Sequence, residues 1–232
     1  MTSMDSVTAR DVSIAVGATI LQGVLRVPRE ARAIVLFAHG SGSGRQSPRN
    51  AYVAERLSNA GLATLLFDLL TDEEEEIDSV TAELRFDIPL LTDRLVATTV
   101  WTQRHPELQG LTIGYFGAST GAAAALIAAA ERPNDVAAVV SRGGRPDLAG
   151  DYLGRVRAPT LLIVGGDDTA VLELNREALR LIEAPKQLAV VAGATHLFEE
   201  PGTLEEVARL AGDWFTEHLG ALASAETHVG TS

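Results

Sequence analysis

Six short, uninterrupted apolar runs are the feature that most restricts how this chain can fold. They cover residues 33–38, 63–67, 111–116, 136–140, 160–164 and 188–191. An apolar run of this length, with no alternating polar positions, is typical of a parallel strand that helices cover on both sides. Residues 13–16 and 19–27 precede these runs and end at Pro28. We expect them to form a leading antiparallel pair.

Helix-length stretches separate the apolar runs. Residues 51–60 follow Pro48, residues 89–104 repeat leucine and valine at i,i+4 spacing, and residues 121–130 are almost all alanine. A further helix is indicated by an apolar stripe of Leu204, Val207, Leu210, Ala211, Trp214 and Phe215. The alternation predicts an α/β fold, in which a doubly wound, mostly parallel sheet of eight strands has helices on both faces.

We expect residues 1–220 to form a single domain, because no stretch rich in Pro, Gly or Ser divides the 232-residue chain. Residues 221–232 are small and polar, which indicates a flexible C-terminal tail. The connections between elements are too short to hold a cap domain. Residues 72–78 (DEEEEID) are interpreted as a solvated loop, since a calcium loop would alternate Asp or Asn with Gly.

Composition excludes several kinds of partner and chemistry. The chain has 31 acidic and 19 basic residues and a net charge of −12, which repels nucleic acids and anionic membranes. It has no cysteine, so disulfides, cysteine-based metal sites and a thiolate nucleophile are excluded. No apolar run reaches the ~18 residues of a membrane span, and residues 1–11 lack the apolar centre of a secretion signal. We therefore expect a cytoplasmic protein with a small-molecule substrate.

A G-x-S-x-G pentapeptide provides the candidate nucleophile. Residues 117–121 read GASTG and lie between the apolar run 111–116 and the alanine-rich helix. A nucleophile elbow has this context, because small flanking residues let strand and helix approach closely while a strained turn exposes the serine hydroxyl. Ser119 is therefore the predicted nucleophile. The alternative is a turn serine that caps the helix.

A serine hydroxyl needs a general base, and the base needs a carboxylate to orient it. Of the five histidines, His196 is the one in a loop directly after the last apolar run. Asp167 and Asp168 both follow the run 160–164 and are both candidates for the acid. The alternatives are a surface-loop histidine and an aspartate that caps the next helix.

A glycine-rich loop provides the candidate oxyanion hole. Residues 39–44 read HGSGSG and directly follow the run 33–38. We assign the donors to the backbone N–H groups of Ser41 and Thr120, with Gly42 as the alternative for the first, and each such donor is worth ~2.7–4 kcal/mol. A phosphate-binding loop is the other interpretation, but the loop has no lysine and no G-x-x-x-x-G-K-[ST] pattern.

The segments HGSGSGR, GASTG, GGDDTAV and GATHLF, which together span nearly the whole chain, resemble the α/β-hydrolase superfamily. The absence of a lid and the segment SRGGRPDL at 141–148 resemble its dienelactone hydrolase branch. The resemblance implies an α/β-hydrolase sheet with Ser119 as nucleophile, Asp168 as the acid and His196 as the base. Dienelactone hydrolases carry a cysteine in G-x-C-x-G, whereas this chain has Ser119, so ordinary carboxylic esters are the expected substrates.

The expected function is therefore that of a serine hydrolase that cleaves small-molecule carboxylic esters through an acyl-enzyme intermediate, with no metal or organic cofactor. A lactonase, a dienelactone-type hydrolase or a thioesterase would share every residue named above. A ligand-binding or interaction protein with this fold is the non-enzymatic alternative. Arg85, Arg142 and Arg145 could each bind an anionic substrate group, but structural ion pairs are the preferred interpretation.

Overall fold

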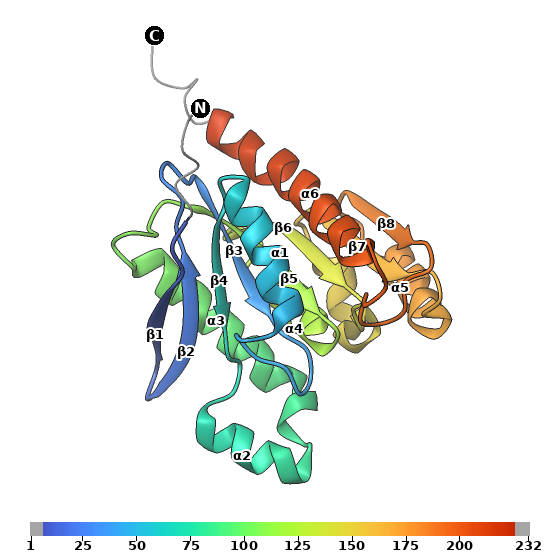
Figure 1. The fold of residues 1–232 in the computed structure, drawn as a ribbon, viewed down its shortest axis with the longest axis horizontal. Helices are drawn as coiled ribbons and strands as arrows, with labels where there is room; N and C mark the ends of the chain where they lie inside the picture. The colour runs from blue at the N-terminus through green and yellow to red at the C-terminus, as the bar shows by residue number, and fades with distance from the viewer. Residues whose placement is uncertain (1–6, 226–232) are drawn as a thin grey trace.

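The structure is a computed structural model that describes residues 7–225, and these form a sheet between two layers of helices (Figure 1). The sheet has eight strands in the order β1-β2-β4-β3-β5-β6-β7-β8. The strands are β1 (Arg10–Val16), β2 (Thr19–Arg26), β3 (Ala33–Ala38), β4 (Ala63–Phe67), β5 (Thr112–Ala118), β6 (Val136–Arg142), β7 (Thr160–Gly165) and β8 (Lys186–Val191). Strand β2 runs antiparallel to both β1 and β4, and all other neighbours are parallel. The predicted sheet, including its leading antiparallel pair, is confirmed.

Helices cover both faces of the sheet, as the apolar runs predicted (Figure 1). Helices α1 (Pro48–Asn59) and α6 (Thr203–Ala225) lie on one face. The other face is covered by α3 (Ile88–Arg104), α4 (Thr120–Glu131), α5 (Thr169–Leu181) and the 3-10 segment η2 (Pro146–Arg155). Helix α2 (Asp72–Thr81) and the 3-10 turn η1 (Leu84–Phe86) project from this body.

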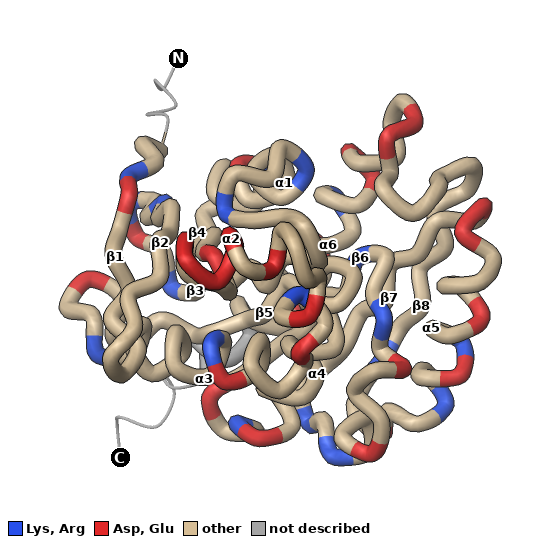
Figure 2. Tube along the Cα trace, turned by 90° about the horizontal axis from the view of Figure 1, so that it is seen from below, with Lys and Arg blue, Asp and Glu red and all other residues tan. Residues whose placement is uncertain are grey.

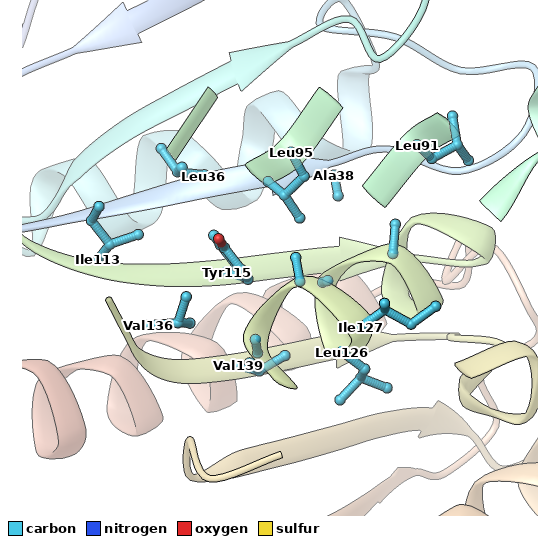
Figure 3. Close-up of a cluster of buried hydrophobic side chains, with 14 of the residues drawn as sticks. Leu36, Ala38, Leu91, Leu95, Ile113, Tyr115, Leu126, Ile127, Val136 and Val139 are labelled. Carbon is cyan, nitrogen blue, oxygen red and sulfur yellow. The ribbon is translucent and has the colours of Figure 1, made fainter. Parts of the chain in front are cut away.

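The core between the sheet and α3 and α4 shows why helix α4 is so rich in alanine. Every residue from Thr120 to Ala130 of α4 is buried, so small side chains let the helix approach β5 and β6 closely. Larger side chains fill the space around it, including Leu91 and Leu95 of α3 and Tyr115 of β5 (Figure 3). The Tyr115 hydroxyl is hydrogen-bonded to Thr99 at 2.6 Å, and burial raises the pKa of Tyr115 well above its usual value. A tightly packed support of this kind keeps the start of α4 in a defined position.

The acidic run 72–78 is a helix, so its interpretation as a solvated loop was wrong. A capping box begins α2: the Glu74 N–H donates to Thr71 Oγ1 at 3.1 Å, and the Thr71 N–H donates to Glu74 Oε2 at 2.8 Å. Carboxylates in the first turn also interact favourably with the positive end of the helix dipole. Figure 2 shows the resulting acidic stretch along α2. The Thr-x-x-Glu spacing was the signal that would have predicted this helix.

Helix α6 extends to Ala225, which is five residues into the segment expected to be a tail. The rest of that segment, residues 226–232, lies outside the described residues. Between residues 7 and 225, no helix has both the length and the apolar character that a membrane crossing requires.

Candidate active site

The loops after β3 and β5 meet at the point where the strand order reverses. From β3 the chain crosses to β4 on one side, and it then returns to β5 on the other side of β3. In open α/β sheets this reversal leaves a crevice beyond the carboxyl ends of the strands. The glycine-rich loop leaves β3 here, and Ser119 follows β5. The fold therefore brings two of the sequence-predicted segments to one edge of the sheet.

Ser119 lies in a strained turn between β5 and α4. Its backbone has φ 50° and ψ −121°, a conformation that residues other than glycine rarely adopt. A Cβ atom on Gly117 would collide with Ala122, and one on Gly121 would collide with the carbonyl oxygen of Ala38. The two glycines of the pentapeptide are thus required by the close approach of strand, turn and loop. The Ser119 side chain makes no capping hydrogen bond to α4, which removes the alternative interpretation as a helix cap.

His196 and Asp168 are hydrogen-bonded to each other. The distance from His196 Nδ1 to Asp168 Oδ2 is 2.7 Å, and the two side chains are 39% and 13% exposed. Asp168 begins α5 but makes no side-chain capping bond, so its carboxylate serves the histidine and not the helix. Asp167 is exposed, and its backbone N–H donates to the Ala194 carbonyl. The local pattern left two aspartates open, and Asp168, which the family resemblance implied, is the one that contacts the imidazole.

The loop after β6 connects Ser119 with His196. The Ser119 N–H donates to the Arg142 carbonyl at 3.3 Å, and the Arg145 N–H donates to the Ser119 carbonyl at 3.0 Å. Gly143, between them, has φ 51°, and a Cβ atom there would lie 3.6 Å from His196 Cε1. Among the described residues no hydrogen bond joins the Ser119 hydroxyl to His196. Such bonds are often long before a substrate is bound.

The loop that carries His196 is held by Glu200. The Glu200 carboxylate accepts hydrogen bonds from Thr195 Oγ1 at 2.6 Å and from the Thr195 N–H at 3.1 Å. The hydrogen bonds from Thr195 lower the pKa of Glu200, and the bond from the Thr195 side chain has the largest effect. Phe198, in the same loop, is buried and has a φ of 56°. Sequence reasoning assigned no role to these two residues.

The two predicted oxyanion donors face each other, Ser41 from the glycine-rich loop and Thr120 from the first position of α4. Ser41 Oγ and Thr120 Oγ1 are 3.3 Å apart, and neither backbone N–H of these residues has a hydrogen-bond acceptor among the described residues. Gly40 packs so closely on the turn that a Cβ atom there would lie 2.9 Å from Ser119 Cβ. Both amides are therefore available beside the candidate nucleophile.

His39 holds the glycine-rich loop in place. Its Nε2 accepts from the Leu69 N–H at 2.9 Å, so Nδ1 carries the proton and donates to the Gly40 carbonyl at 2.9 Å. Burial lowers the pKa of His39, and the neutral tautomer fits both bonds. The sequence placed His39 in this loop without assigning it a role. Its position between a strand and a glycine was the available signal.

A cavity of about 610 Å³ adjoins the glycine-rich loop. Its wall is largely polar or charged and includes Ser41, Arg45, Ser47, Asp68, Asp72 and Glu75. Arg45 and Asp68, both in this wall, form an ion pair. A larger hollow of about 890 Å³ lies at the amino ends of the strands, around Arg32, Thr112 and Val136. The candidate site residues are at the opposite edge, where this type of sheet binds its ligands.

The three arginines near the site differ in their partners. Arg85 pairs with the buried Asp78, with 2.6 Å between Nε and Oδ2, and Arg145 pairs with Asp147 at 2.7 Å. These two arginines form ion pairs within the protein, which agrees with the preferred structural interpretation. Arg142 has no acidic partner among the described residues and bonds only to the neutral Asn50, with Nη2 3.3 Å from Oδ1.

In the part of the chain that the structure describes, no three His, Cys, Asp or Glu side chains group in a way that could hold a metal ion.

Comparison with known proteins supports the family and the fold. The model of the dienelactone hydrolase family matches residues 21–221. A dienelactone hydrolase from Anabaena variabilis is 59% identical, with a TM-score of 0.91 over 92% of this chain and 99% of that chain. Est1E from Butyrivibrio proteoclasticus, 16% identical over 90% of this chain and 99% of that chain, shares the fold with a TM-score of 0.76.

Two curated relatives from Mycobacterium tuberculosis strains are each 60% identical over 209 residues, which is 90% of this chain. Their names propose a phosphoribosyl transferase. This chain spans only 46% of their length.

Proposed function

The chain belongs to the dienelactone hydrolase family, and from this premise we propose that it is a serine hydrolase that cleaves carboxylic esters of small molecules through an acyl-enzyme intermediate. The hydrolase family and its esterase neighbours support the general class. The finer assignment depends on one observation: a carboxylate–imidazole pair, 2.7 Å apart, and a serine on a strained strand-to-helix turn both approach the loop after β6.

In the proposed reaction, the Nδ1–H group of His196 donates a hydrogen bond to Asp168. Nε2 then carries no proton and can act as a base. Nε2 takes the hydroxyl proton as Ser119 attacks the ester carbonyl. The N–H groups of Ser41 and Thr120 stabilise the oxyanion that forms. His196 then passes this proton to the departing alcohol. It next takes a proton from a water molecule that attacks the acyl-enzyme carbonyl, and it gives that proton to the Ser119 oxygen as the acid leaves.

The serine is also where the proposal departs from dienelactone hydrolysis. Ser119 occupies the position where dienelactone hydrolases carry cysteine, and an alkoxide forms less readily than a thiolate, so the hydroxyl depends more strongly on the base. Lactones and thioesters remain alternative substrates, because the same residues would act on them. A panel of p-nitrophenyl esters, lactones and thioesters at equal concentration separates these classes by kcat/KM.

Phosphoribosyl transfer is not what this site supports best. That activity is attached by name to proteins of which this chain covers 46%. A serine activated by an imidazole–carboxylate pair serves acyl transfer, whereas transfer of a phosphoribosyl group needs no such nucleophile.

A cytoplasmic location and a single domain over residues 1–220 remain predictions.

The proposal is tested with a fluorophosphonate probe. We expect one label per chain, located at Ser119 by mass spectrometry, and a loss of ~10⁶ in kcat for Ser119→Ala. Folded wild-type protein that takes up no label and hydrolyses none of the panel would favour the alternative of a ligand-binding or interaction protein. Label at another residue would refute the assignment of Ser119.

A further inference from the structure

Arg142 is a buried cation that no carboxylate within residues 7–225 neutralises. The residue is 8% exposed, and its Nε and Nη1 have no hydrogen-bond partner among the described residues. Nη2 reaches only the amide oxygen of Asn50, which is 2% exposed. Burial and the charge of Arg49 lower the pKa of Arg142 to about 10, so the guanidinium is still protonated at neutral pH. Arg49 itself pairs with Glu199 at 3.3 Å.

An unneutralised buried charge is costly, and this chain could have avoided it with one substitution. Asn50 lies in the first turn of α1, where a carboxylate would also interact favourably with the helix dipole. The chain has twelve more acidic than basic residues, yet the residue facing Arg142 is an amide. Departures of this kind from local stability are expected at functional sites.

The position of Arg142 relates this charge to the candidate site. Its carbonyl accepts the Ser119 N–H, and Gly143, the next residue, packs against His196. Its side chain lies on the α1 side of the sheet and bonds to the first turn of that helix. The same turn forms part of the wall of the cavity that contains Ser41, through Ser47, Pro48 and Arg49. The guanidinium therefore lies behind the wall of the cavity that Ser41 also lines.

We propose that the unneutralised guanidinium of Arg142 stabilises the negative charge that develops on the substrate oxygen when Ser119 attacks. This inference rests on the proposed serine hydrolysis and adds a residue to it. Arg142 does not touch the substrate, so it acts as a positioning residue that sets the electrostatic potential around the oxyanion. A neutral ester gains little from this potential when it binds, whereas the anionic tetrahedral intermediate is stabilised. The charge should therefore affect kcat and leave KM nearly unchanged.

Asn50→Asp tests the role of the charge, because it neutralises Arg142 and leaves the guanidinium in place. At an effective dielectric constant of ~20, a unit charge that acts over about 8–10 Å changes a rate by roughly 10- to 30-fold. We expect kcat for neutral p-nitrophenyl acetate to fall by that factor, with KM within about twofold of wild type and a melting temperature that is equal or higher. Asn59→Asp is the matched control, because Asn59 is exposed at the other end of α1. It should keep the wild-type kcat.

Two substitutions of Arg142 itself complete the experiment. Arg142→Lys keeps the charge and should retain kcat within about threefold, whereas Arg142→Met removes it and should lose as much as Asn50→Asp. A purely structural role would instead leave kcat unchanged in a folded Asn50→Asp variant. If Arg142 instead binds an anionic substrate, Asn50→Asp would raise KM for esters that carry a carboxylate and would leave kcat and KM for p-nitrophenyl acetate unchanged. Either result would overturn the inference.

The two proposals fail in different ways. If wild-type Ser119 takes up no fluorophosphonate, the proposed function fails. If Ser119 is labelled and Asn50→Asp has wild-type kcat, only the role of Arg142 fails.

Discussion

Replacing Asp168 by asparagine is the sharpest perturbation of the candidate site, because the neighbouring Asp167 provides a control with the same chemical change. Asp168 Oδ2 lies 2.7 Å from His196 Nδ1, and its side chain is only 13% exposed. Asp167 is exposed and has no side-chain hydrogen bond among the described residues. If the proposed mechanism is correct, Asp168→Asn disables the base, whereas Asp167→Asn changes the net charge equally and leaves the base intact.

The size of the effect follows from the geometry. A carboxylate about 4 Å from the charge centre of an imidazolium, at an effective dielectric constant of ~20, contributes ~4 kcal/mol, which is about 10³ in rate. Asparagine can also donate its own N–H to Nδ1, which would move the imidazole proton to Nε2 and block the base. We expect the two effects together to lower kcat by about 10⁴.

The assay is release of p-nitrophenolate from p-nitrophenyl acetate, with folding of each variant checked by circular dichroism. The rate of fluorophosphonate labelling at Ser119 should fall in Asp168→Asn along with kcat. Asp167→Asn should stay within about twofold of wild type in both. An Asp168→Asn variant within tenfold of wild type, or an equal loss in the two variants, would refute the assignment of Asp168.

Two further predictions concern the scaffold. Gly121→Ala should lower the free energy of unfolding in urea by ~1–3 kcal/mol and kcat/KM by about 10²-fold, because its Cβ would collide with the Ala38 carbonyl and displace the Thr120 amide. Gly212→Ala on α6, where the new Cβ would be 3.7 Å from Leu57 Cδ2, should be neutral or stabilising, and an equal loss there would contradict the collision argument. For the buried Asp78, burial raises its pKa, but the hydrogen bonds and charge of Arg85 outweigh this and hold the pKa below its usual value. Because the folded-state pKa is lowered, the stability that Asp78 contributes is present above about pH 4 and is lost as the pH falls through the folded value. Urea unfolding from pH 7 to pH 2.5 should therefore show the gap between wild type and Asp78→Asn narrowing only below about pH 4, and a gap that is constant with pH would exclude this linkage.

Much of the fold could be read from local pattern. All eight strands appear where apolar runs or alternating segments predicted them, since a strand covered on both faces must be apolar throughout. Helix α2 was predicted wrongly, because its run of like charge suggested a solvated loop. In α2 the capping box and the helix dipole outweigh the repulsion between neighbouring carboxylates.

The candidate site was only partly readable. A pentapeptide between a strand and a helix identifies Ser119, because the close approach that requires glycine is local in sequence. The choice between Asp167 and Asp168 is different, since two adjacent aspartates after one strand have the same local pattern. The fold resolves it by directing the Asp168 side chain toward His196, which lies 28 residues further along the chain.

By itself, then, the sequence determined the sheet, its helical layers and the segments that gather at its carboxyl edge, because each depends on periodicity and on residues close together in the chain. The resemblance implied Asp168, but only the tertiary structure showed that its carboxylate faces His196, how His39 and Glu200 hold their loops, and that Arg142 is buried against an amide and not against an acid. These are contacts between side chains far apart in sequence. Their energies depend on distance and burial, which no local pattern encodes.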